Sequence, residues 1–352
     1  MAENMVSGPG DEEIRKVQLT GGATYTISLP KKWVVANEIQ PRDSLRLDWR
    51  PSGAIRLTPL HISEQTGKRL DIVADKLPQG SLHDHLMAAY ISGGDLIKVR
   101  YESGSEKKYS REIRRFLRNT RGFEILAEDD ESQSLVCLIK SGEMPLQSSL
   151  NRMYFLLSSL SRDVMAVFGG EDLEILSDDG ERESEVDAMH YLIERQVGVL
   201  LDFHAVASSL DINRNQAVQC ANLANSLERM MDHMFQITTL IRETQPLPKL
   251  DAASEPLIHI PVWQSALKQM MIDIRTRDSH SIEKARESLR SAQKELGEHE
   301  ERMMVDKKRR ALPMLFEFRL SESIRRLCAY ALDIGETLLN MKAYDEMIIE
   351  YN

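Results

Sequence analysis

The sequence of 352 residues predicts a multidomain protein with an N-terminal β domain, a small α+β domain in the middle and an all-α C-terminal half of two three-helix bundles in tandem. Three observations predict this fold class. Short apolar–polar alternations fill the N-terminal part, strand-like and helix-like stretches mix in the middle, and from position 148 apolar residues recur at steps of three and four. The expected parts are a disordered lead-in 1–13, a β domain 14–60, an α+β linker domain 61–145, helical repeats 148–245 and 262–345, and a proline-rich linker 246–261.

The composition restricts the classes of function. A net charge of −10, with 42% hydrophobic and 28% charged residues, describes globular domains and argues against a protein coated in nucleic acid, although one domain can still be basic. The three cysteines form no Cys-x-x-Cys pair, so neither a zinc knuckle nor a disulfide framework is indicated, and a reducing compartment fits. The N-terminus is polar and acidic, and no apolar run approaches the roughly 20 residues of a membrane helix. We therefore expect a cytoplasmic protein without membrane insertion.

Residues 14–60 predict four short strands around one short helix. Two strands are expected within 14–29, the helix at 31–37 and a hairpin of strands at 44–49 and 54–58. The segment carries eight basic and only three acidic residues, an excess of five positive charges in an acidic protein. A local excess of this kind is what contacts to DNA phosphates require. The candidate DNA-binding residues are Arg15, Lys16, Lys31, Lys32, Arg42 and Arg46.

A family resemblance extends over nearly the whole of this segment. The LPKKW element and the turn before Asp43 carry it, within the string TISLPKKWVVANEIQPRDSLRLDWRPSGAIRLTPL. The segment resembles the AbrB/MazE/SpoVT family of swapped-hairpin DNA-binding domains. The resemblance implies an intertwined homodimer that places basic residues on DNA. The alternative is that the head only dimerises and its charges are solvated.

The middle segment predicts a small α+β unit. Its strands and helices are expected at 69–74 (strand), 81–91 (helix), 96–101 (strand), 106–119 (helix), 123–127 (strand) and 134–139 (strand). The second helix carries a basic cluster made of Arg111, Arg114, Arg115, Arg118 and, just beyond its end, Arg121. Such a cluster can contact DNA phosphates or bind an anionic ligand, and it can equally be a solvated helix face.

The C-terminal half predicts six helices in two groups of three. They are expected at 150–168, 181–209 and 215–243, and then, after a break with four prolines, at 262–277, 281–309 (with a break inside) and 312–344. The third helix has one apolar stripe, formed by Val218, Ala221, Ala224, Leu227, Met231, Met234, Ile237 and Ile241. Beside that stripe Glu228 and Asp232 lie one turn apart, where two carboxylates can hold a hard cation or be braced by an arginine.

The segment LERMMDH and its neighbours resemble the LERIGDHA segment of the PhoU family of phosphate-uptake regulators. Members of this family consist of two three-helix bundles in tandem. The family carries an E/D-x-x-x-D pair on the second and third helices of each repeat. In the first repeat these pairs match Glu183 with Asp187 and Glu228 with Asp232. The resemblance thus implies one metal site in repeat one, and oxygen ligands favour Mg, Mn or Fe. The alternative is that the four carboxylates pair with an arginine such as Arg229 or Arg195. PhoU relatives of archaeal type with an AbrB-like head have a similar middle insert.

The second repeat departs from this pattern. In the alignment of the two third helices, Arg325 stands at the position of Glu228 and Ala329 at the position of Asp232. The second helix of this repeat has no E/D-x-x-x-D in register. A second metal site is therefore not expected, and Arg325 can take the place of the metal's charge or contact an anion.

The resulting hypothesis is a phosphate-responsive DNA-binding transcription regulator with a PhoU-like sensing bundle. The expected partners are DNA, a second copy of the chain, and a phosphate transporter ATPase subunit or a phosphate sensor protein. The alternative is an adaptor that dimerises through its head, does not bind DNA and docks on the transporter ATPase or sensor.

An enzyme is not expected, because no nucleophile–base grouping, phosphate loop or dinucleotide turn occurs. A di-metal enzyme would need two Glu-x-x-His pairs, and only Asp187 with His190 comes near one.

Overall fold

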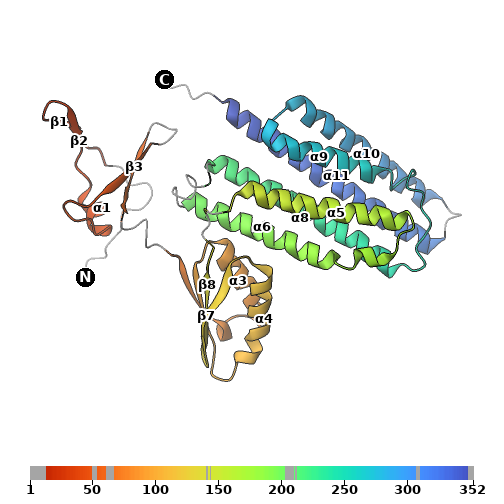
Figure 1. Ribbon diagram of the computed structural model, residues 1–352, viewed down its shortest axis with the longest axis horizontal. Coiled ribbons are helices and arrows are strands. Elements are labelled where there is room, and N and C mark those ends of the chain that lie inside the picture. The colour runs from red at the N-terminus through yellow and green to blue at the C-terminus, as the bar shows by residue number, and fades with distance from the viewer. Residues whose placement is uncertain are drawn as a thin grey trace. The chain divides into compact units, whose positions relative to one another are not determined.

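A computed structural model describes residues 13–49, 54–60, 67–139, 142, 144–202, 210, 212–306 and 310–347 (Figure 1). The chain divides into two compact units, residues 1–68 and 69–352, and each is described by itself. Nearly all of the predicted lead-in, residues 1–12, lies outside the described residues.

The first unit has the predicted order of two strands, a short helix and two strands. These elements are β1 Gln18–Thr20, β2 Thr24–Thr26, α1 Lys31–Ala36, β3 Leu45–Trp49 and β4 Ile55–Pro59. The strands form two separate antiparallel hairpins, β1 with β2 and β3 with β4. Gly21 and Gly22 make the first turn at φ values of 65° and 80°, a backbone conformation that glycine adopts without strain.

This unit has almost no core of its own. Among its described residues only Pro59 is buried. Large apolar side chains are instead exposed: Trp49 is 77% exposed, Tyr25 75% and Val35 66%. The described part of this unit therefore leaves much of its apolar surface open to solvent.

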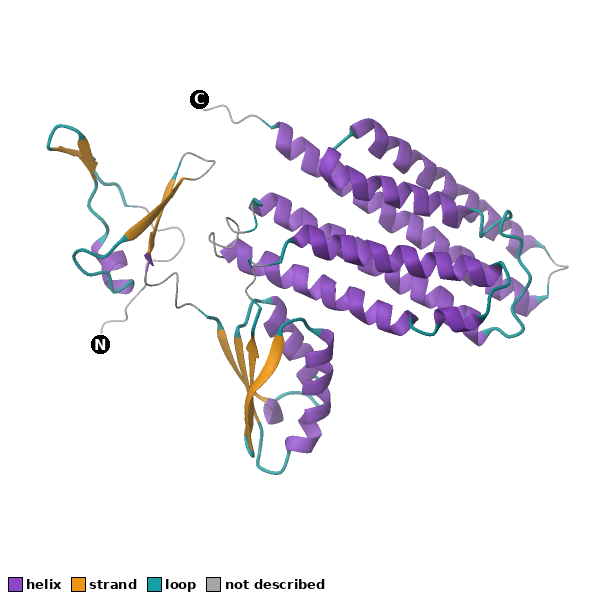
Figure 2. Cartoon of the chain, viewed as in Figure 1, coloured by secondary structure: helices purple, strands orange, loops and turns teal. Residues whose placement is uncertain are grey.

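The second unit begins with a four-stranded sheet of order β5-β6-β8-β7. Its elements are β5 Arg69–Val73, the 3₁₀ helix η1 Ala74–Lys76, α3 Leu82–Ile91, β6 Leu96–Arg100, α4 Glu106–Asn119, β7 Phe123–Asp129 and β8 Ser132–Cys137. The first two strands pair in parallel and the other pairs are antiparallel. Side chains of α3 and α4 share one core with the sheet, including the fully buried Leu86, Tyr90, Phe116 and Leu135, and the two helices lie beside the sheet in Figure 2. The α+β prediction for this segment is confirmed.

The rest of the chain is helical. Its elements are α5 Leu146–Phe168, the 3₁₀ helix η2 Leu173–Leu176, α6 Asp179–Asp202, α8 Arg214–Glu243, α9 His259–Thr276, α10 Ser279–Val305 and α11 Ala311–Glu346. One continuous hydrophobic core joins the two groups of three helices, and α8 packs against α5, α6 and α11. In the described part of the chain no helix is long and apolar enough to cross a membrane.

Three expectations for the helical half are wrong in detail. The linker predicted at 246–261 ends earlier, because α9 already begins at His259 and Pro261 lies in its first turn, where a missing N–H leaves no bond unmade. The helix α10 runs from Ser279 to Val305 without the expected break. Val218 is 39% exposed because it lies on the side of α8 opposite to the buried Leu227 and Met234.

The middle domain and the helical half, predicted as separate, belong to one compact unit. Each has its own core, and Arg195 of α6 is one side chain that joins them. Its guanidinium donates to the backbone carbonyls of Tyr90 at 2.9 Å and Gly94 at 2.7 Å, and pairs with the carboxylate of Asp95 at 2.8 Å. Arg195 is only 2% exposed. This arginine is therefore committed to the middle domain and is not the partner of the α6 carboxylates that the sequence had left open.

Candidate functional site

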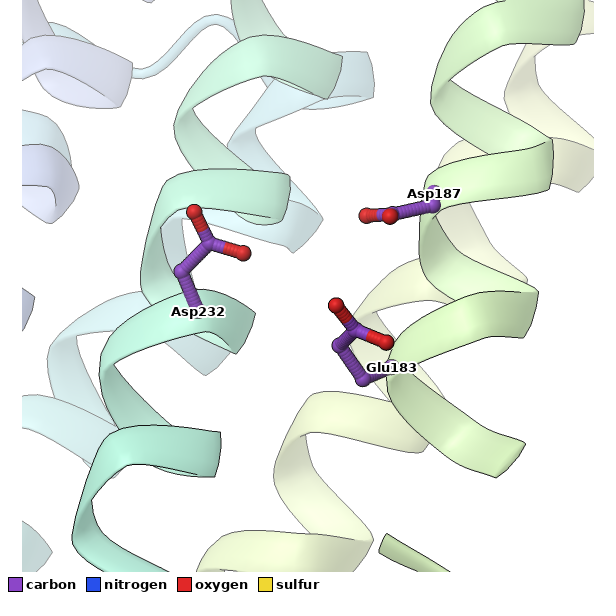
Figure 3. A group of neighbouring side chains, drawn as sticks. All are labelled: Glu183, Asp187 and Asp232. Carbon is purple, nitrogen blue, oxygen red and sulfur yellow. The ribbon is translucent and has the colours of Figure 1, made fainter. Parts of the chain in front are cut away.

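Three carboxylates from two facing helices come together in the first helical repeat. Glu183 and Asp187 lie one turn apart on α6, and Asp232 points toward them from α8 (Figure 3). One oxygen of each lies within 4.8 Å of the others. The local sequence fixes where α8 begins. Asn213 and Gln216 form a reciprocal capping box at its start, with the Gln216 N–H donating to Asn213 Oδ1 at 2.8 Å. The structure thus places three of the four predicted metal ligands in one group.

Burial makes this group electrostatically unfavourable without a cation. Burial raises the pKa of Asp187 to about 7, with Glu183 and Asp232 adding to the effect. Burial also raises the pKa of Glu183 and of Asp232 above their ordinary values. The three groups therefore resist ionising together near neutral pH. A divalent cation would relieve both the repulsion and the loss of hydration.

The fourth predicted ligand, Glu228, lies beside the group and not within it. It is one turn before Asp232 on α8, and burial raises its pKa to about 7, with Asp232 contributing. Its Oε2 is buried and accepts no hydrogen bond from any residue that the structure describes. Arg229 approaches Glu228 at 3.6 Å and Asp232 at 3.8 Å. That arginine is 53% exposed, so it braces the carboxylates only weakly.

Two further polar residues on α6 were not assigned to the metal site by the sequence interpretation, although His190 had been noted beside Asp187. His190 is buried, and burial lowers its pKa to about 4. Among the described residues its two ring nitrogens have no hydrogen-bond partner. Glu194 Oε1 lies 3.6 Å from His190 Nε2, and burial raises the pKa of this carboxyl. The signal was present in the spacing: positions 183, 187, 190 and 194 fall on one face of a helix. An oxygen-rich row with one neutral imidazole therefore lines this face.

The second repeat has an internal ion pair where the first has carboxylates. Glu300 of α10 is 8% exposed, and its Oε1 accepts from Arg325 Nε at 3.1 Å and from the Ser321 hydroxyl at 3.0 Å. No group of three metal-ligating residues other than the one in repeat one occurs in the described ranges. The geometry agrees with the expectation that Arg325 supplies a positive charge in this repeat.

Replacing Arg325 by methionine is expected to lower the free energy of unfolding by about 1–3 kcal/mol, because the buried Glu300 carboxylate would keep only one hydrogen-bond donor. Replacing Glu300 by glutamine in the same chain should recover part of this loss. Urea unfolding of the two single variants and the double variant measures the coupling. Additive losses would mean that the two side chains do not stabilise each other.

The candidate DNA-binding residues all lie in the first unit. Lys16, Lys31, Lys32 and Arg42 are exposed, with the two lysines at the start of α1. Arg15 pairs with Glu13, and Arg46 Nε approaches Asp48 Oδ2 at 3.2 Å. Arg42 adopts a φ of 84° in the turn before β3. Local acids thus offset two of the six positive charges, and the two exposed lysines of α1 are the least constrained of the candidate residues.

The helical half belongs to the class of all-helical proteins built from packed groups of three helices, with a carboxylate group held between the second and third helices of the first group. A comparison with protein families agrees with this class: residues 150–241, which span most of α5 and all of α6 with α8 up to Ile241, match the model of the PhoU domain. The match covers 92 of the 352 residues, so support for the PhoU family comes from this segment. No curated protein matches the chain. The resemblance of residues 14–60 to AbrB-like domains receives no support from the match and stays a prediction.

The PhoU match supports a role in the regulation of phosphate homeostasis. It contains all four predicted carboxylate ligands. It also contains His190 and Glu194, the two residues that the sequence interpretation did not assign to the site.

Proposed function

We propose that this protein is a phosphate-responsive regulator that binds DNA through a dimeric head and uses its first helical repeat as a metal-dependent sensing or interaction element. The observation that carries the phosphate assignment is the PhoU match over residues 150–241. The proposed role is one of binding, and no residue is assigned a catalytic step.

The carboxylate group is suited to a hard divalent or iron-type cation. Its donors are all oxygens, which Mg, Mn and Fe accept as ligands. The buried Glu228 oxygen without a hydrogen bond is a further donor at the edge of the group. Glu183, Asp187 and Asp232 would hold the ion, with Glu228 as a fourth ligand. A bound ion would cross-link α6 to α8.

The link between α6 and the middle domain is relevant to sensing. The same helix carries the carboxylates near its start and Arg195, which is anchored to the middle domain, two turns after Asp187. The helix α6 packs in the core of the helical bundle and is bonded through Arg195 to the middle domain. A change in the distance between α6 and α8 would therefore act on a helix that contacts both domains. Because one helix carries both the carboxylates and Arg195, a bound cation could affect the middle domain. This arrangement supports a regulatory role for the cation in place of a purely structural one.

The first unit supports the proposed dimer and its DNA contacts. Its exposed apolar side chains, such as Trp49 and Tyr25, are surface that a second copy would cover. Its two lysines at the start of α1 are exposed, which supports the proposal that they contact DNA phosphates. In the alternative function the head only dimerises and the helical half docks on a phosphate transporter ATPase subunit or a sensor protein. The observation that favours the alternative is that the family match lies in the helical half.

Binding of the purified full chain to sheared DNA from its source organism, over a salt series, tests the proposal. We expect a few promoter fragments to be retained at physiological salt. The Arg15→Ala/Lys31→Ala/Lys32→Ala variant should lose them, and the slope of log affinity against log salt should fall by about 0.9 for each phosphate contact removed. The matched control is Lys249→Ala/Lys268→Ala/Arg275→Ala, which removes the same charge from exposed positions of the helical half.

Sequencing of the retained fragments separates the two functions. Enrichment near phosphate-transport genes would support the phosphate assignment as well as DNA binding. Equal weak retention of all fragments, or none, would contradict DNA binding and leave the adaptor function. A head variant that behaves like the control would show that the assigned residues do not contact DNA.

A further inference from the structure

The helix α4 of the middle domain presents a purely cationic face to solvent. Its buried residues are Tyr109, Ile113 and Phe116, which pack into the core of the sheet. On the opposite side Lys107, Arg111, Arg114, Arg115 and Arg118 are all exposed. At 3.6 residues per turn these five positions fall within an arc of about 100° and along a length of about 16 Å. We call this set the α4 cationic face.

The charges of this face are not neutralised within the described part of the chain. None of its five side chains forms an ion pair or hydrogen bond with another described residue. The acids of the helix lie off the face: at 100° per residue Glu106 falls about 80° and Glu112 about 60° outside its arc, and Glu112 accepts from the backbone N–H of His83 at 3.1 Å. Five like charges side by side repel one another, and the helix keeps this arrangement in a protein whose net charge is −10.

We propose that the α4 cationic face is a second DNA-binding surface that contacts the phosphate backbone of duplex DNA. This inference rests on the DNA binding proposed above and adds a contact surface outside the head. Four of the five side chains are arginines, whose planar fork of donors matches phosphate oxygens in pairs. A straight, rigid row of about 16 Å can follow several successive phosphates of one strand.

The chemistry of the face distinguishes DNA from other anionic partners. Helices that lie on membranes insert an apolar side into the lipid, but the apolar side of α4 is buried in the core of its own domain. A protein partner would need apolar anchors at the centre of the contact, and the five positions of the face carry none. Uniform positive charge without aromatic or aliphatic side chains is what phosphate-backbone contacts use.

The test measures the affinity of the full chain for a duplex retained in the fragment experiment, over a salt series, with three variants. The first is Arg111→Gln/Arg114→Gln/Arg118→Gln. The second is the same triple change to lysine, and the third is the charge-matched control Lys249→Gln/Lys268→Gln/Arg275→Gln. All these positions are exposed, so we expect the fold to persist, and circular dichroism verifies it.

The glutamine variant should bind roughly ten- to a hundredfold more weakly than the control, with a salt slope lower by about 2.7 for three lost contacts. The lysine variant should keep the slope and lose only part of the affinity, because charge remains and the paired donors are gone.

Three outcomes would overturn the inference. If the glutamine variant matches the control while the head variant has lost binding, the face plays no part and DNA binding by the head still stands. If the wild type binds no duplex at any salt concentration, both this inference and the proposed DNA binding fail. If the glutamine variant loses binding to polyglutamate or to vesicles of anionic phospholipid as strongly as to DNA, the face is a general anion surface and the assignment to DNA is wrong.

Discussion

Replacing Arg195 by methionine is expected to lower the free energy of unfolding by about 3–5 kcal/mol, which is among the larger losses that a single substitution causes. The guanidinium donates to the carbonyls of Tyr90 and Gly94 and to the Asp95 carboxylate. Methionine has a similar length but no donor, so two buried carbonyls each lose a hydrogen bond. Differential scanning calorimetry should record a fall in Tm of the order of 10 °C.

The surroundings of Arg195 explain why the effect should be large. The guanidinium carbon lies 5.2 Å from the ring centre of Tyr90 and 5.6 Å from that of Phe123, within the range of cation–π attraction. Tyr90 belongs to the last turn of α3, where carbonyl groups lack partners inside the helix and a cation is favourable. Gly94 is also tightly placed, since a Cβ there would lie 2.9 Å from the carbonyl oxygen of Ala89. The arginine thus holds together two segments about 100 residues apart in sequence.

Arg152→Met is the matched control for this prediction. Arg152 makes a two-pronged ion pair with Glu185 between α5 and α6, at 2.9 and 3.0 Å, but it is 45% exposed. Its loss should lower stability by less than about 1 kcal/mol. If Arg195→Met lowered stability as little as this control, the cost of desolvating the guanidinium would nearly equal the free energy that its hydrogen bonds contribute. A calorimetric trace that splits into two transitions would show instead that Arg195 holds the middle domain and the bundle in one cooperative unit.

Addition of Mn²⁺ to metal-free protein is expected to raise its Tm, since the ion binds the folded carboxylate group and relieves its repulsion. At a hundredfold excess over Kd the stabilisation is about 2.7 kcal/mol. The Asp187→Asn/Asp232→Asn variant should lose this shift. The charge-matched control Asp333→Asn/Glu336→Gln, on α11, should keep it, because these exposed carboxylates lie outside the group of three. An equal rise in the double asparagine variant would contradict the assigned site.

The pH dependence of the metal-free protein follows from the same pKa values. A carboxyl whose pKa is raised in the folded state binds its proton more tightly there, so it weakens stability increasingly as pH rises through the interval between its unfolded and folded pKa values. For Asp187 this interval runs from 3.8 to about 7, and for Glu228 from 4.5 to about 7. Asp187→Asn should therefore stabilise the metal-free protein at pH 8, by roughly 1–2 kcal/mol after allowance for partial solvent exposure, and have little effect at pH 4.

The comparison is made as the difference between wild type and variant at each pH. His190 titrates in the opposite sense, because its pKa is lowered to about 4 and its stabilising contribution is lost as pH falls below the unfolded value of 6.5. That contribution is common to both proteins and cancels in the difference. A gain from Asp187→Asn that did not depend on pH would indicate a packing effect and not the removal of an unfavourable charge.

The amino-acid sequence by itself determined the order and type of the elements. The helix predicted at 106–119 is α4, Glu106–Asn119, and each of the six predicted helices of the C-terminal half is present with shifted ends. Periodicity, turn residues and capping residues act within short segments, so they can be recognised without knowing what a segment packs against. Spacing along a helix likewise predicted that Glu183 and Asp187 share one side of α6. It also predicted that the arginines of α4 lie close together on that helix.

The tertiary structure alone decided which side chains from different segments meet. It separated Glu228 from the group of three carboxylates, and it paired Arg325 with Glu300 and Arg195 with the end of α3. Each of these depends on the rotation and offset of one helix against another, which the packing of the cores sets and the period of a single helix leaves free. For the same reason burial, and with it the raised pKa of Asp187, could not be inferred from the spacing of carboxylates along α6 and α8.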